Sequence, residues 1–176
     1  MKTINDWFDE YGESHQNKKN KIIHWICIPL IFWSIIALLS LIPSEQMKFT
    51  GLNILDGCLH WGAAIIILGL LFYFRLSFSI FLGMFIFSLL TLLDIYFTVY
   101  WFDTHKFWGI LDFIDLSGKT FLLYLSILVF IIAWIMQFIG HKIEGKKPSF
   151  FKDLQFLLIG PAWLLGFVLK KLKIKY

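Results

Sequence analysis

The stretch "IIHWICIPLIFWSIIALLSLI", residues 22–42, is the first long apolar run of the chain. A helix that spans a bilayer needs about 20 consecutive apolar residues, and this run is long enough. The apolar core of a cleavable signal peptide is shorter, at about 7–15 residues, and follows a basic segment. Here the preceding segment contains Asp6, Asp9, Glu10 and Glu13. We therefore expect residues 22–42 to form a transmembrane helix that is not removed.

The composition of the whole chain indicates the same class of protein. Hydrophobic residues make up 59% of the 176 residues and charged residues only 16%, whereas a soluble domain carries about a quarter charged residues. The mean hydropathy is +0.74. The net charge of +4 reflects lysines that flank apolar runs, which favours a membrane protein over a nucleic-acid-binding one. Cys27 and Cys58 are too few for a disulfide framework, and we expect them to be small apolar fillers.

Further apolar runs predict an all-α, polytopic membrane protein with a single domain, residues 1–176. Three more runs are long enough to cross the bilayer: 59–74, 76–101 and 121–139. A fifth run, 154–169, is interrupted by Gly160-Pro161, and proline removes a backbone donor. We expect it to form a re-entrant, bent hairpin or an interfacial segment. Four spans with both termini in the cytoplasm then keep most lysines inside, as the positive-inside bias requires.

Residues 1–20 carry an amphipathic pattern. Apolar and aromatic side chains recur at helical spacing, with the acidic residues mostly elsewhere; the recurring residues are Ile4, Trp7, Phe8, Tyr11 and His15. This pattern predicts a helix that lies on the bilayer surface with its aromatic rings at headgroup level. His15 continues the buried stripe, where an unpartnered imidazole would be costly.

The predicted topology gathers four polar side chains at one face of the membrane. His15 lies just before the first span, and His24 lies one turn into it. His141 lies at the end of the fourth span on the same side, and Glu144 follows about one turn later. The remaining histidines, His60 and His105, fall at the opposite face.

Imidazole together with carboxylate binds first-row transition metals. Two or three histidines with one carboxylate and open positions suit non-haem Fe(II), which coordinates substrate and oxygen together. Asn20 and Gln137 lie one helical turn before His24 and His141, where they are candidates to orient the imidazole rings. The alternative is that each histidine is an interfacial residue bonded to water or to a lipid headgroup.

Two blocks of sequence contain these residues: "YGESHQNKKNKIIHWICIP", residues 11–29, and "WIMQFIGHKIEGKKPSFFKDLQFLLIGPAW", residues 134–163. They resemble the signature blocks of a membrane family of 2-hydroxy-fatty-acid dioxygenases, which includes the fungal endoplasmic-reticulum enzyme of phytosphingosine breakdown. The positions that match are Tyr11, His15, Asn17, Asn20, His24, Pro29, Gln137, Phe138, Gly140, His141, Glu144, Pro148 and Asp153. The resemblance implies an Fe(II)-dependent enzyme that uses O₂ to shorten a 2-hydroxy fatty acid by one carbon.

Several roles at this site stay open. A 2-hydroxy carboxylate can chelate iron, and Glu144 is either a further ligand, a base, or an exposed partner for a lysine. Tyr11 is the second catalytic candidate, or else an interfacial aromatic residue. Lys146 and Lys147 are candidates to attract the substrate carboxylate, and the alternative is that they only set the topology.

Two other classes of function compete with the enzyme. In a small transporter or channel, the proton path would consist of Asp94, His60 and His105. An acidic residue such as Asp94 is energetically costly within a span, which makes it a candidate for a functional role. A non-catalytic scaffold protein is the third class. Short loops and the lack of a targeting peptide favour the inner membrane of a bacterium.

Overall fold

The computed structural model describes residues 2–104, 117–145 and 150–176, and for residues 150–155 it gives the backbone alone. The regular elements of this part of the chain are all helices, so the predicted all-α class is confirmed. The longer helices are α2 (Lys18–Ser40), α4 (Trp61–Leu76), α5 (Phe78–Thr104), α6 (Gly118–Glu144) and α7 (Phe150–Lys171). The shorter elements are α1 (Ile4–Gly12), the 3-10 turn η1 (Glu45–Met47) and α3 (Asn53–Cys58).

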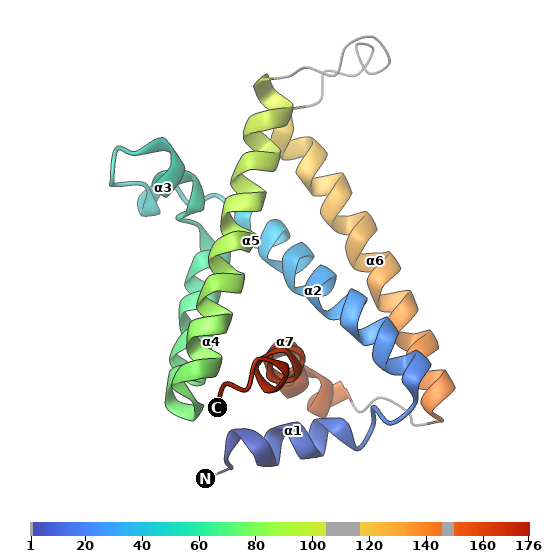
Figure 1. The fold of residues 1–176 in the computed structure, drawn as a ribbon. Helices are drawn as coiled ribbons and strands as arrows, with labels where there is room; N and C mark the ends of the chain where they lie inside the picture. Colours follow the sequence, from blue (N-terminus) through green and yellow to red (C-terminus); the bar gives the residue numbers. More distant parts are fainter. Residues whose placement is uncertain (1, 105–116, 146–149) are drawn as a thin grey trace.

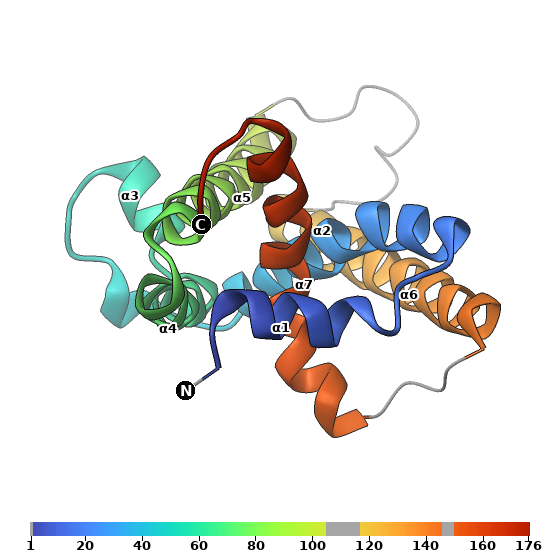
Figure 2. The same cartoon turned by 60° about the horizontal axis from the view of Figure 1, so that its bottom comes forward.

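Four helices form the body of the molecule. The most extensive packing is between α2 and α6, and α5 lies between α4 on one side and α6 on the other (Figure 1). Helices α1 and α7 lie across one end of this bundle, and Figure 2 shows them crossing each other. Both chain termini lie at that end, whereas η1 and α3 lie toward the opposite end. The molecule therefore has one end that is covered by transverse helices.

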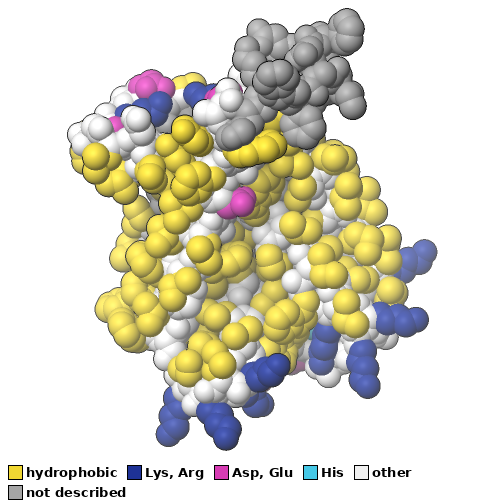
Figure 3. Space-filling model, turned by 45° about the horizontal axis from the view of Figure 1, so that its top comes forward, with side chains coloured by type: hydrophobic (Ala, Val, Ile, Leu, Met, Phe, Trp, Pro, Cys, Tyr) yellow, Lys and Arg dark blue, Asp and Glu magenta, His cyan; other side chains and the backbone are white. Residues whose placement is uncertain are grey.

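The outer surface is that of a membrane protein. Helices α2, α5 and α6 are each long and apolar enough to cross a membrane. Helix α4 is apolar but shorter, with 16 residues or about 24 Å. Large apolar side chains face outward on these helices; for example, Leu68 is 62% exposed and Leu90 60%. Figure 3 shows apolar side chains along the sides of the molecule, with many of the lysine and arginine side chains gathered at its lower end.

Capping residues, rather than the ends of the apolar runs, set the start of α2 and both ends of α6. Asn17 Oδ1 accepts a hydrogen bond from the amide of Lys19 at 2.9 Å and begins α2 four residues before the predicted span. Ser117 caps α6 in the same way, and Gly145, with a φ of 73°, ends it. Helix α1 ends at Gly12, so it is shorter than the surface helix predicted for residues 1–20.

Helix α7 is one continuous helix, not a bent hairpin. Pro161 lies inside it, where the missing amide removes one intrahelical hydrogen bond. The side chains around this proline are buried: Ile159, Ala162 and Trp163 are 5% exposed or less and pack with Phe8 of α1. Burial of these side chains offsets the lost hydrogen bond, because each large apolar side chain contributes about 1.5–3 kcal/mol. The sequence left open a bent hairpin or an interfacial segment for residues 154–169. The bent hairpin is wrong, because α7 is a single helix that lies across the end of the bundle (Figure 1).

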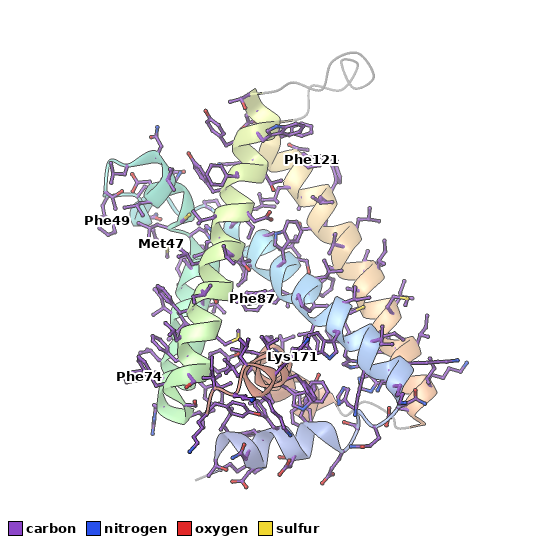
Figure 4. The ribbon with its side chains drawn as sticks, in the orientation of Figure 1. Met47, Phe49, Phe74, Phe87, Phe121 and Lys171 are labelled. Carbon is purple, nitrogen blue, oxygen red and sulfur yellow. The ribbon has the colours of Figure 1, made fainter. Side chains whose placement is uncertain are left out.

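Aromatic contacts and one glycine fix the spacing of the helices around the cavity described below. Phe87 extends from α5 toward α2, where its ring lies 5.1 Å from that of Phe32 (Figure 4). At the other end of α2, Gly140 of α6 lies against the Asn20 side chain, and an added Cβ at this glycine would collide with Asn20 Oδ1. The expected role of Gly140 in close helix packing agrees with this contact.

Candidate metal centre

Three histidines from distant parts of the sequence meet at the end of the bundle that α1 and α7 cover. His15 lies in the turn between α1 and α2, His24 near the start of α2, and His141 in the last turn of α6. Each offers one ring nitrogen, and these three atoms lie within 4.8 Å of one another. In the described part of the chain, these three residues form the group that is close enough to hold one metal ion.

The histidine rings are held among protein atoms rather than in solvent. His15 and His24 are each 2% exposed, and His141 is half-buried. The ring centroids of His15 and His24 lie 4.2 Å apart, and those of His24 and His141 lie 5.2 Å apart. Because buried polar groups need partners, the three imidazoles gathered here are candidates to share one bound ion.

Backbone carbonyls fix the tautomers of two of these rings. His15 Nδ1 lies 2.6 Å from the carbonyl oxygen of Tyr11, and His24 Nδ1 lies 3.0 Å from that of Asn20. A carbonyl oxygen only accepts, so each Nδ1 carries the hydrogen and donates it. The lone pair then lies on Nε2 in both rings. This is the arrangement in which metal-binding histidines are usually held, with the other ring nitrogen donating to a protein oxygen.

Aromatic side chains enclose His15. The ring of Tyr11 stacks on the imidazole at 4.2 Å with an interplanar angle of 12°, and Trp163 of α7 lies 5.5 Å away. Burial lowers the pKa of His15 from its ordinary value to about 4, because the charged form loses its hydration. His15 is therefore neutral at physiological pH, which is the form that binds metals. Tyr11 therefore lies at the site, as expected from the sequence.

Glu144 lies beside the histidine group and not within it. Its carboxylate accepts hydrogen bonds from the amides of Gln16, at 2.7 Å, and Asn17, at 3.0 Å. It also accepts one from Asn20 Nδ2 at 3.0 Å. These donors belong to the turn before α2 and to its first residues, where a negative charge is also favoured by the helix dipole. The carboxylate thus joins the end of α6 to the start of α2.

The two predicted orienting residues differ in what they contact. The backbone carbonyl of Asn20 holds His24, while its side-chain amide donates to Glu144 and, at 3.3 Å, to the carbonyl of Ser14. Gln137 is 6% exposed and lies one turn before His141 on the same face of α6. Its side chain lines a cavity next to the histidines.

This cavity, of about 70 Å³, is lined by residues of α2, α6 and α7 together with the histidines. Its far part is apolar. The lining residues include all three histidines, Tyr11 and Ser14 at one end, and Ile28, Ile31, Phe32, Phe138, Phe156, Leu157, Gly160 and Pro161 along the walls. A metal bound to the histidines would therefore face a small, mostly apolar space.

Two tryptophans near the site were not predicted from the sequence. Trp134 lines the cavity, and Trp163 packs on Tyr11 and His15. The spacing of Trp134, Gln137 and His141, at i, i+3 and i+7, already places them on one helical face. That spacing is a usable signal for Trp134, whereas Trp163 reaches His15 only through the packing of α7.

Of the other predicted residues, His60 and Asp94 can be placed, and neither belongs to the histidine group. Lys146, Lys147 and His105 fall outside the described residues. His60 caps the start of α4, where its Nδ1 accepts a hydrogen bond from the amide of Gly62 at 3.1 Å. Asp94 accepts a hydrogen bond from Trp33 Nε1 at 2.7 Å. These are two separate local contacts, one at each residue, and they give no specific support to a proton path through Asp94 and His60.

The residues present fit a transition-metal ion. Their donors are imidazole nitrogens, which suit iron, copper, nickel and zinc, and two rings are already held in the tautomer that leaves Nε2 free to bind. His15 Nε2 is buried and has no hydrogen-bond partner in the described part of the chain. A metal ion would satisfy this atom. An ion held by these three residues would keep further coordination positions open.

Fold and site together define a class of protein: an α-helical chain with membrane-length helices and a candidate three-histidine metal centre beside an apolar cavity. The model of the family described as "2-hydroxy-palmitic acid dioxygenase Mpo1-like" matches residues 1–172, and the chain belongs to this Mpo1-like family. The resemblance seen in the two sequence blocks is thereby confirmed. Searches of curated proteins and of solved structures found no significant match.

Proposed function

We propose that the chain is a non-haem Fe(II) dioxygenase that shortens 2-hydroxy fatty acids by one carbon, a reaction of fatty-acid α-oxidation. The observation that supports it is the group of three buried or half-buried histidines at the mouth of an apolar cavity. The family description, which names 2-hydroxy-palmitic acid, gives the substrate class. In the net reaction the C1–C2 bond breaks, and one hydroxy acid and one O₂ balance as the shorter acid, CO₂ and water.

His15, His24 and His141 would hold the iron. When bound, Fe(II) would activate O₂ and offer open positions to the hydroxy acid, whose own oxidation supplies the electrons that reduce O₂. The backbone carbonyls of Tyr11 and Asn20 keep the imidazoles oriented toward one point. Orientation of this kind contributes to catalysis because the reacting groups do not have to be ordered during the reaction.

The cavity walls would bind the acyl chain. Ile28 and Ile31 of α2 and Leu157 of α7 present apolar surface next to the histidines, so that the polar end of a fatty acid is directed toward the metal. Burial of the chain excludes water from the reacting carbons, at a gain of about 0.8 kcal/mol for each buried CH₂ group. The substrate would reach this space from the bilayer, in which fatty acids are dissolved.

We also propose that the protein lies in a bacterial inner membrane with both termini in the cytoplasm. The lysines and the arginine that the sequence assigns to the inner side support this orientation. The site would then lie at the cytoplasmic headgroup level, where a hydroxy acid places its carboxylate in water and its chain in lipid.

The experiment that tests the function uses purified protein with Fe(II), air and 2-hydroxypalmitate. We expect the fatty acid one carbon shorter as the product, whereas palmitate, which lacks the second chelating oxygen, remains unchanged. Elemental analysis should find about one iron per chain. His15→Ala, His24→Ala and His141→Ala should each lose most of the iron and the activity.

His60→Ala is the matched control, because His60 is also buried but lies on α4, outside the histidine group. It should keep both iron and activity. Product formation that persists in all three site variants would contradict the proposal, as would iron loss confined to His60→Ala.

A further inference from the structure

Two polar groups in the cavity have no partner within the described residues. The indole nitrogen of Trp134 and the amide oxygen Oε1 of Gln137 are both buried, and neither makes a hydrogen bond there. Both residues line the same cavity as the histidines. A buried donor or acceptor without a hydrogen-bond partner costs about 1–3 kcal/mol of stability. Two such groups in one cavity therefore indicate that a bound molecule supplies their partners.

The two residues lie close to each other on α6. Trp134 and Gln137 are three residues apart, so their Cβ atoms are neighbours on one helical face, about 5–6 Å apart. His141 follows four residues later on the same face. A group that enters the cavity beside the histidines therefore meets two polar side chains that lie on the same face of α6.

The pair has opposite hydrogen-bonding roles. An indole N–H can only donate, and an amide oxygen can only accept. A hydroxyl both accepts and donates, so one hydroxyl can satisfy both residues at once. A plain alkyl chain can satisfy neither, and an ether or ketone oxygen can satisfy only the indole.

We infer that Trp134 and Gln137 form hydrogen bonds with the 2-hydroxyl group of the substrate and discriminate against unsubstituted fatty acids. The indole N–H donates to the hydroxyl oxygen, and the hydroxyl donates to Gln137 Oε1. This inference rests on the proposed function and adds to it the residues that determine specificity. A site built to bond a hydroxyl rejects the analogue without it strongly, because its own polar groups are then left unpaired.

The test measures binding, not turnover. Purified protein is kept under nitrogen, and the dissociation constants of 2-hydroxypalmitate and palmitate are determined by calorimetry, with the metal content measured in the same samples. Trp134→Phe removes the donor and keeps an aromatic ring, and Gln137→Leu removes the acceptor at similar volume. We expect each to reduce the preference for the hydroxy acid about 10-fold or more.

Palmitate binding separates recognition from structural damage. In both variants the affinity for palmitate should be unchanged or higher, because an unpaired polar group has been removed, while general damage would weaken both ligands. Trp25→Phe is the matched control, since Trp25 is 41% exposed and outside this cavity, and it should leave the preference unchanged.

The binding data separate a failure of the proposed function from a failure of this inference. If the wild-type protein binds neither acid, the proposed function and the inference both fall. If it prefers the hydroxy acid and the preference survives in Trp134→Phe and Gln137→Leu, the function stands and the inference is wrong. A lost preference that accompanies lost metal also overturns the inference, because the effect then acts through the metal centre.

Discussion

Glu144 illustrates how one carboxylate can support a site without being part of it. It accepts hydrogen bonds from two backbone amides before α2 and from the Asn20 side chain. Asn20 in turn provides the backbone carbonyl that holds His24. The polar residues at the end of α6 therefore serve a contact between α6 and α2. Through this contact the positions of His141 and His24 depend on each other.

Glu144→Gln tests this role. The glutamine keeps the shape but turns an N–H₂ group toward donors, so hydrogen bonds to the turn before α2 are lost. We expect the metal content to remain near the wild-type level, because the carboxylate already accepts hydrogen bonds from Gln16, Asn17 and Asn20. The free energy of unfolding should fall by about 1–3 kcal/mol, measured by thermal or denaturant unfolding in detergent.

Glu45→Gln is a suitable comparison, since Glu45 pairs with Lys48 on the surface, and it should change the stability little. Iron that disappears from Glu144→Gln while the protein stays folded would instead make Glu144 a ligand.

At the residue scale, the sequence placed the histidines at one membrane face but not in contact. Depth along each span follows from counting residues, so His60 and His141 could be assigned to opposite ends. Whether three rings face one another depends on how α1, α2 and α6 pack, and no short-range pattern encodes that. Trp134 was overlooked because a tryptophan in an apolar run is typical of any lipid-facing helix.

At the scale of the helices, hydropathy locates the elements better than it locates their ends. The apolar run at 22–42 corresponds to α2, which starts earlier at Lys18 because Asn17 caps it. The run at 121–139 corresponds to α6, which continues to Glu144 because the chain stays helical up to Gly145. For 154–169 the sequence suggested a break at Pro161, yet burial of the surrounding side chains keeps α7 helical.

Gly140 allows α6 to pack closely against α2. A Cβ at this position would collide with Asn20 Oδ1 and lie 3.4 Å from Ile23 Cγ2. We expect Gly140→Ala to destabilise the protein by about 1–3 kcal/mol, because α6 must move away from α2. The metal affinity should fall as well, since His24 and His141 lie on the two separated helices.

Gly69→Ala in α4 provides the control for helix propensity. Its added Cβ would make ordinary contacts, the nearest at 3.7 Å with Leu158. It should be neutral or slightly stabilising, as is usual for glycine to alanine in a helix. Equal stability losses in the two variants, compared by unfolding, would argue against a close contact at Gly140.

At the scale of the whole molecule, the end covered by α1 and α7 also holds both termini (Figure 1). Reporter fusions test the orientation. A reporter after Tyr176 should be active on the cytoplasmic side, and one within residues 44–57 on the other side, because α2 separates the two positions. A reporter at Tyr176 that is active outside would reverse the proposed orientation, and the metal centre would then lie at the outer face.

The three candidate ligands come from segments that separate when the chain unfolds, so a metal ion that binds them would act as a cross-link. Such an ion binds the folded state only and shifts the folding equilibrium by mass action. Cells that lack iron would then hold more of the chain in opened forms, which membrane proteases degrade. The abundance of the protein would follow the iron supply of the cell without any dedicated regulator.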